Sequence, residues 1–183
     1  MAGRAPRRHR AELLEAASAA RPSASGARHG RRAATRARFA IVAARFNERI
    51  TTRLVDGARH VFEAAAVPAS NLEVHWVPGS FELPQAAACL AATGHYAGIV
   101  CVGVVIRGQT PHFEHVAREA AAGIRQVAIA TGIPVTFGVI TALTEEQALD
   151  RAGGEVGNRG EEAAEAALEM AAFVQRVRRG RVR

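Results

Sequence analysis

Short apolar or alternating runs are separated along this chain by segments whose apolar residues recur every three or four positions. Runs of about four to eight such residues, bounded by turn residues, predict β-strands. Four of them occur, at residues 39–44, 72–77, 99–106 and 135–140. The run at 99–106 is apolar throughout, which is expected of a strand that is covered on both faces.

Segments with helical spacing lie between these runs and predict α-helices. In the first segment the apolar face consists of Leu54, Val55, Ala58, Val61, Phe62 and Ala65. Local signals help to bound the later helices. Gly132 and Pro134 end the third helix, and Thr144 with Gln147 forms a capping box at the start of the fourth. These later helices are expected at residues 83–92, 112–130, 144–151 and 160–174.

Strands that alternate with helices favour parallel pairing through right-handed crossovers. The chain has 183 residues, which is enough for one domain with a buried core, and 49% of them are hydrophobic. The sequence therefore predicts an α/β domain over residues 39–175. Its expected architecture is a three-layer sandwich in which helices flank a flavodoxin-like, four-stranded parallel sheet.

Charge divides the chain into a middle and two ends. All 24 basic residues are Arg, of which ten lie in residues 1–38 and five in residues 176–183. Residues 39–175 carry nine Arg and 15 of the 17 acidic residues, so the net charge of +7 belongs to the ends. We expect a disordered N-terminal extension and a basic C-terminal tail. The extension fits an inert or wrongly assigned start, a polyanion-binding tail, or an organellar transit peptide, against which Glu12 and Glu15 count.

Cys89 and Cys101 are the two cysteines, and their spacing indicates no metal site. Thiols in such apolar or alanine-rich segments are consistent with a reducing compartment. No apolar run is suited to a signal peptide or to a membrane span. The sequence thus predicts a cytoplasmic protein.

Three of the four predicted strands are followed by unusual segments, at the sheet edge where ligands bind in open parallel sheets. Phe46 and Phe81 directly follow strands, where an aromatic ring could stack on a flat heterocycle or pack at the edge of the core. Glu82 could hydrogen-bond a sugar hydroxyl or a ring N–H. Alternatively, it is an acidic residue favoured at a helix N-terminus by the dipole.

The segment after the third strand carries the most specific chemistry. Thr110 is suited to cap the following helix, and Pro111 to its first turn. The backbone N–H groups of residues 108–110 would then form an anion or phosphate site. His112, in the first turn, is a candidate for proton transfer. The alternative is a well-capped helix that carries a surface histidine.

Together, five ordered segments resemble the lumazine synthase family, and they span essentially all of residues 39–175. A single segment would be a weak signal, whereas five with the family's spacing are a strong one. The segments are RFN at 45–47, PGSFELP at 78–84, VIRGQTPHF at 105–113, FGVIT at 137–141 and DRAGGEVGNRG at 150–160.

This resemblance implies a transferase of riboflavin biosynthesis. In that family 5-amino-6-(D-ribitylamino)uracil condenses with 3,4-dihydroxy-2-butanone 4-phosphate, releasing phosphate and water and giving 6,7-dimethyl-8-ribityllumazine. The reaction uses no metal and no redox cofactor, so no cofactor is expected here.

The resemblance also assigns roles to individual residues. Gln109 and Thr110 would line the phosphate pocket, and His112 would transfer protons. Phe137 and Arg151 would come from a neighbouring subunit, with Arg151 pairing with the phosphate. The residues that would hold the pyrimidine and its ribityl chain are Phe46, which stacks on the ring, and Ser80, Phe81, Glu82, Val104, Val105 and Ile106.

Arg159 departs from the pattern, since the family usually has Lys there, and a planar guanidinium is not equivalent to an ammonium group. The expected partners are the two small-molecule substrates and further copies of the chain. Family members form pentamers, and the compact turn at 153–158 is typical of members that build sixty-subunit shells. No membrane is expected, and nucleic acid only through the Arg-rich ends.

Two other classes of function compete with the enzyme. Flavodoxin-like sheets also host flavins and nucleotides, so a flavin-binding module is one alternative. A shell-forming or polyanion-binding homologue without catalysis is the other. The combination of Phe46, Glu82, His112 and Arg151 argues for a catalyst. Riboflavin synthase is disfavoured because the chain has no duplicated halves.

Overall fold

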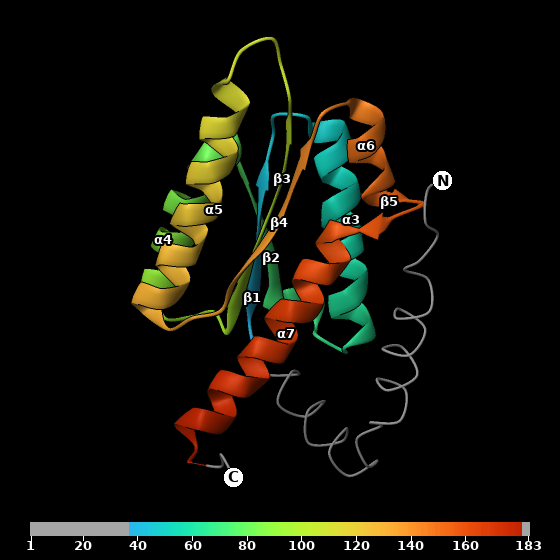
Figure 1. Ribbon diagram of the computed structural model, residues 1–183. Helices are drawn as coiled ribbons and strands as arrows, with labels where there is room; N and C mark the ends of the chain where they lie inside the picture. The colour runs from blue at the N-terminus through green and yellow to red at the C-terminus, as the bar shows by residue number, and fades with distance from the viewer. Residues whose placement is uncertain (1–36, 181–183) are drawn as a thin grey trace, which may run out of the picture.

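The structure is a computed structural model that describes residues 37–180. The predictions made for the N-terminal extension up to residue 36 and for residues 181–183 lie outside this range. Within it, four parallel strands form one sheet in the order β2-β1-β3-β4 (Figure 1). The strands are β1 (Phe39–Ala44), β2 (Leu72–Val77), β3 (Gly98–Ile106) and β4 (Val135–Ala142).

Helices cover both faces of this sheet, with α4 and α5 on one side and α3 and α7 on the other (Figure 1). The predicted three-layer α/β sandwich is therefore confirmed. The long helices are α3 (Glu48–Ala64), α4 (Leu83–Ala92), α5 (His112–Thr131) and α7 (Arg159–Arg178). The shorter elements are η1 (Ala69–Asn71), η2 (Ser80–Glu82), α6 (Glu145–Asp150), β5 (Ala152–Gly154) and β6 (Gly157–Asn158).

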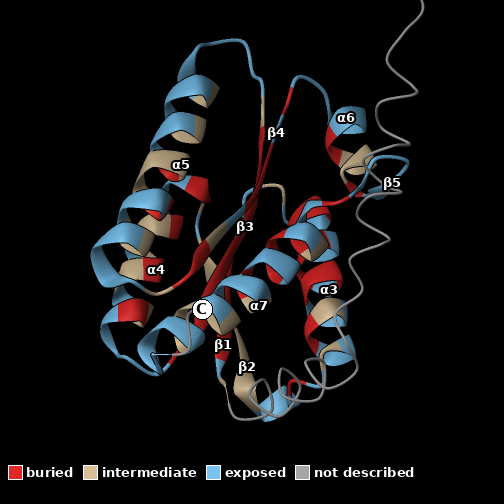
Figure 2. Cartoon of the chain, turned by 60° about the horizontal axis from the view of Figure 1, so that its bottom comes forward, coloured by how far each residue is buried: buried red, intermediate tan, exposed pale blue. Residues whose placement is uncertain are grey.

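The two central strands are buried because both of their faces are covered. Along β1, Ile41 and Ala43 pack in the cluster beneath α3 and α7, while Ala40 and Val42 pack beneath α4 and α5. Side chains alternate between the faces of a strand, so an unbroken apolar run is required. Figure 2 shows β1 and β3 in the colour of buried residues, whereas the edge strand β2 is intermediate.

Helix α7 lies against α3 at touching distance. A Cβ atom built on Gly160 would lie 2.0 Å from the carbonyl oxygen of Leu54. The Asn158 side chain holds this crossing, since its Oδ1 accepts from the Gly160 N–H at 2.8 Å and its Nδ2 donates to the Arg53 carbonyl at 3.0 Å. The start of α7 is thereby fixed relative to α3.

Two start signals differ in detail from the prediction. The Thr144 side chain accepts from the Gln147 N–H, as expected, but Gln147 Oε1 accepts from the Leu143 N–H, one residue before the cap. At the start of α5 the N-cap is Pro111, and Thr110 makes no side-chain cap bond, so the predicted Thr110 cap is wrong. Pro111 already has helical backbone angles (φ −65°, ψ 0°), which moves the cap to the proline.

At its C-terminal end α7 runs to Arg178, four residues past the predicted Val174, and projects beyond the sheet (Figure 1). Within the described part of the chain, none of the helices combines the length and the apolar character needed to cross a membrane.

Candidate active site

A cavity of about 450 Å³ lies at the carboxyl ends of β1, β2 and β3 and at the start of α5. Nine of the twelve residues predicted for the site line it, although they come from four separate segments. The nine are Phe46, Ser80, Phe81, Glu82, Val104, Val105, Ile106, Thr110 and His112. The arrangement expected of an open parallel sheet thus brings most of the candidate chemistry together.

The other three predicted residues lie elsewhere. Gln109 belongs to the β3–α5 loop but does not line the cavity. Phe137, on β4, is 44% exposed, and Arg151, directly after α6, donates from its guanidinium to the Gln147 carbonyl at 3.0 Å. Phe137 and Arg151 therefore do not enter the cavity of their own chain.

Two exposed aromatic rings border the cavity. Phe46 is 71% exposed and Phe81 is 57% exposed, so both rings present apolar surface at the same cavity. The Phe46 N–H donates to the Pro78 carbonyl at 3.1 Å, so the segments after β1 and β2 are held side by side. Flat apolar surfaces at the mouth of a cavity are suited to an aromatic ligand.

Ser80 supplies a polar group inside the cavity. Its side chain is only 4% exposed, and its Oγ has no hydrogen-bond partner among the described residues. A Cβ atom on Gly103 would lie 2.6 Å from this Oγ, so β3 needs a glycine there to leave room for it. Buried hydroxyls are nearly always hydrogen-bonded, which makes Ser80 a group that a ligand can satisfy.

Glu82 is partly buried and is the N-cap of α4, but its side chain makes no capping bond. A Cβ atom on Gly79 would lie 3.1 Å from Glu82 Oε2, so the carboxylate folds back over its own loop. An ionised carboxylate accepts hydrogen bonds only, and here it can bind hydroxyl or N–H groups of a ligand.

The start of α5 supplies backbone donors and an imidazole. The first N–H groups of a helix lack intrahelical partners and attract anions, and here they begin at His112 because Pro111 has no N–H. The His112 side chain is exposed at the cavity. His115, one turn on, lies within 3.0 Å of the Arg118 guanidinium through its Nδ1. The two histidines therefore have different surroundings.

Two apolar lining residues on α5, Phe113 and Val116, were not predicted. Their only sequence signal is that they lie within two turns of His112. Gly108 also lines the cavity and belongs to the segment predicted as an anion site. Between residues 37 and 180, no three His, Cys, Asp or Glu side chains form a group that could hold a metal ion.

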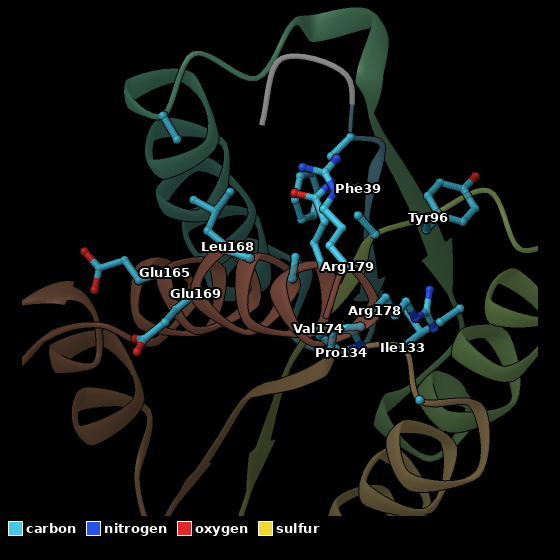
Figure 3. A pocket seen from close by; sticks show the side chains of 17 residues that line it. Phe39, Tyr96, Ile133, Pro134, Glu165, Leu168, Glu169, Val174, Arg178 and Arg179 are labelled. Atoms are coloured by element: carbon cyan, nitrogen blue, oxygen red, sulfur yellow. The ribbon is translucent and has the colours of Figure 1, made fainter. Parts of the chain in front are cut away.

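A second and larger cavity, of about 660 Å³, lies at the opposite end of the sheet, beneath the last turns of α7 (Figure 3). Its wall is mostly apolar, with Phe39, Tyr96, Ile133 and Leu168 among the lining residues. The lining includes no histidine, cysteine, serine or threonine. It therefore lacks a serine, threonine or cysteine nucleophile and a histidine base.

Beside this cavity, Glu73 on β2 joins a polar cluster. Its carboxylate accepts from the Tyr96 hydroxyl at 2.6 Å and is paired with Arg38. The Tyr96 hydrogen bond, followed by that from Arg38, lowers the pKa of Glu73. Burial and the Glu73 bond raise the pKa of Tyr96. This cluster links β2 to the segments that lead into β1 and β3.

Comparisons with known proteins show the family of the chain, whose candidate site is the cavity at the carboxyl ends of the strands, called the strand-end cavity below. A family model described as 6,7-dimethyl-8-ribityllumazine synthase matches residues 36–175. The chain is also similar to a protein of Protochlamydia amoebophila (strain UWE25) named 6,7-dimethyl-8-ribityllumazine synthase. The two are 46% identical over 136 residues, which is 74% of this chain and 79% of the relative.

Proposed function

The chain belongs to the 6,7-dimethyl-8-ribityllumazine synthase family, and we propose that its reaction takes place in the strand-end cavity. It is a transferase of riboflavin biosynthesis that condenses 5-amino-6-(D-ribitylamino)uracil with 3,4-dihydroxy-2-butanone 4-phosphate. The observation that carries the proposed location is the convergence of stacking rings, an unpartnered buried hydroxyl, a carboxylate and an imidazole in one cavity.

The pyrimidine half of the site lies between the loops after β1 and β2. Phe46 stacks on the pyrimidine ring, and Phe81 closes the side of the cavity. The Ser80 hydroxyl bonds a polar edge of the ring, which satisfies a group that is otherwise buried without a partner. Glu82 accepts from hydroxyls of the ribityl chain, while Val104, Val105 and Ile106 form the apolar floor.

The phosphate half lies at the N-terminus of α5. Free backbone N–H groups and the positive end of the helix dipole favour the phosphate there. The Thr110 hydroxyl adds a donor, and Gln109 lies next to it in the same loop. Arg151 of a neighbouring subunit supplies the remaining positive charge, and Phe137 of that subunit covers the ring. Neither residue lines the cavity of its own chain, which supports this division.

The chemistry joins a substrate amine to a substrate ketone. Attack of the amine on the carbonyl carbon gives an imine and releases one water. Removal of a proton, assisted by His112, lets the C–O bond to phosphate break, and phosphate leaves with the electron pair. The enol that is left tautomerises to a ketone at the carbon that carried the hydroxyl. The ribityl-bearing nitrogen then attacks this new carbonyl, and a second water is lost as the ring closes. Because both substrates are reactive, positioning them accounts for most of the rate gain and lowers the activation barrier by up to about 7–11 kcal/mol.

Family membership implies an oligomeric assembly, and we propose a pentamer for this chain. Two exposed large apolar residues support a subunit contact at β4, namely Phe137 on the strand and Leu143 directly after it. A shell of sixty subunits and a decamer are the competing assemblies. Light scattering on the purified chain distinguishes the three by mass. We also propose a cytoplasmic location.

A direct assay tests the proposed function. Purified chain is incubated with the two substrates, and the lumazine product is followed by its fluorescence together with the release of inorganic phosphate. Product and phosphate are expected to appear in equal amounts. Tight binding of a flavin without turnover would instead indicate a binding protein. If every single-residue variant of the cavity kept full turnover, the reaction would take place elsewhere.

A further inference from the structure

The residue after Phe46 has an unusual conformation. Asn47 is the N-cap of α3, and its backbone lies in the left-handed region (φ 62°, ψ 37°). Asparagine tolerates this region far better than most residues with a side chain. Its carbonyl accepts from the Ile50 and Thr51 N–H groups, so the backbone of Asn47 starts the helix.

The side chain of Asn47 has a different use. An N-cap asparagine ordinarily accepts from the N–H groups of the first helical turn, but Asn47 makes no such bond. Its Nδ2 instead donates to the carbonyl oxygen of Val104 on β3, at 3.0 Å, across 57 positions of sequence. The amide therefore connects the segment after β1 to strand β3, and helix capping does not explain it.

The direction of the Val104 carbonyl explains why this bond is needed. Along a strand, backbone groups of alternate residues point to opposite neighbours. On β3 the Ile99 N–H donates to the Pro134 carbonyl, just before β4, and the Arg107 N–H donates to the Ala142 carbonyl at the end of β4. Odd-numbered residues of β3 therefore point toward β4, and the even-numbered Val104 points toward β1. Pairing of β1 with β3 ends at Ala43 and Val102, which leaves this carbonyl without a strand partner. The Asn47 amide takes that place.

Phe46 is consequently held from two sides. Its own N–H donates to the Pro78 carbonyl on the β2 side, and the next residue is tied to Val104 on the β3 side. The ring itself is largely exposed, so packing alone does not fix where it lies. These two hydrogen bonds therefore constrain where the ring lies over the cavity.

We propose that Asn47 is a positioning residue for the pyrimidine substrate. Its side-chain amide bonds Val104 and so holds the Phe46 ring where the ring stacks on the pyrimidine. This inference rests on the proposed role of Phe46 in the strand-end cavity. Asn47 acts through Phe46 and is not assigned a contact with the reacting atoms.

Two single variants separate the amide from the backbone conformation. Asn47→Gly keeps access to the left-handed region and removes the amide, while Asn47→Asp keeps the shape and removes the donor. Loss of one hydrogen bond corresponds to about a 5-fold effect. Both variants are expected to raise the KM for ribitylaminouracil by about 5-fold. The KM for butanone phosphate should stay unchanged, and kcat should change by less than about 2-fold. Asn71→Gly, the same change beside the amino end of β2, serves as the matched control.

A double variant tests the route of the effect. In a Phe46→Ala background, Asn47→Gly should raise the ribitylaminouracil KM no further, because the ring that it positions is gone. Equal effects with and without Phe46 would overturn the inference, as would an unchanged KM in both single variants. A lower melting temperature with unchanged KM values would assign Asn47 a purely structural role. If the unaltered chain makes no lumazine, the proposed function itself fails, whatever the variants do.

Discussion

The two cavities described here lie at opposite ends of one sheet and are lined by side chains of different chemical character. The larger one, beneath the end of α7, is walled mostly by apolar side chains. The smaller one, at the carboxyl ends of the strands, combines exposed aromatic rings, a buried hydroxyl without a partner and a histidine. Volume alone would therefore point to the end of the molecule opposite the proposed site.

The direction of the chain explains this difference. In a parallel sheet the carboxyl end of each strand leads into a helix N-terminus, where N–H groups are free and the dipole is positive. The amino end receives helix C-termini, whose free groups are carbonyls. At that end of this protein, Glu73, Tyr96 and Arg38 satisfy one another. Variants at the two ends should accordingly affect different properties.

The largest effect is expected at the strand-end cavity, from His112→Ala. Loss of assistance to proton transfer should lower kcat by about 100-fold. The free energy of unfolding should barely change, because the side chain is exposed. Steady-state kinetics and urea unfolding measure the two properties. An unaltered kcat would remove His112 from the mechanism, and His115→Ala, one turn away, is the matched control.

Arg151→Ala should raise the KM for butanone phosphate by about 10-fold, because a charge-assisted hydrogen bond to the phosphate is lost. The KM for ribitylaminouracil should not change. If Arg151 acts across a subunit boundary, mixed assemblies of Arg151→Ala and His112→Ala chains should regain activity, since some cavities then receive both intact residues. Mixtures no more active than the separate variants would contradict the shared site.

Phe39→Leu tests the other end of the sheet. Phe39 is buried beside the larger cavity, and its ring centroid lies 4.8 Å from that of Phe62. The change should lower the free energy of unfolding by about 1 kcal/mol through the lost aromatic contact and altered packing. Both KM values and kcat should stay as they are. A changed KM at unchanged stability would mean that the larger cavity takes part in the reaction.

The smallest effect concerns pH. Because Tyr96 and Arg38 lower the pKa of Glu73, the ionised carboxylate stabilises the fold above about pH 4.5, and this contribution is lost as the pH falls through the lowered value. Tyr96→Phe removes the first of these causes. At low salt and pH 7 the melting temperature of this variant should lie below that of the unaltered chain. The difference between the two melting temperatures should become smaller below pH 4.5. A gap of constant size would exclude the Glu73 bond as its source.

Local patterns predicted most of the fold because the spacing of apolar residues in each strand and helix reflects which of its faces are buried. β1 and β3 read as apolar runs since helices cover both of their faces, and the bounds of β2 and α4 agree residue for residue with the prediction. The helix α5 starts at His112 as predicted, but its N-cap was missed by one position because Pro111 itself adopts helical angles. That choice depends on the loop as a whole.

The residues of the candidate site that follow strand ends could be predicted from the sequence. Contacts between distant segments could not. Phe46 and Ser80 follow strands directly, so the sheet topology alone brings them near each other. The bond of Asn47 to Val104 joins segments 57 positions apart, and no local pattern reveals it. The larger cavity arises because α7 overhangs the sheet, which helical periodicity does not predict.

Gly160 has a consequence for how variants of this protein are interpreted. Any side chain at this position would strike the Leu54 carbonyl, push α7 away from α3 and displace the short hairpin that precedes α7 and follows Arg151. In a random library screened by riboflavin production, changes at Gly160 would be grouped with those at His112. A second screen for soluble protein after heating would separate them, since the first class loses the protein and the second loses only turnover.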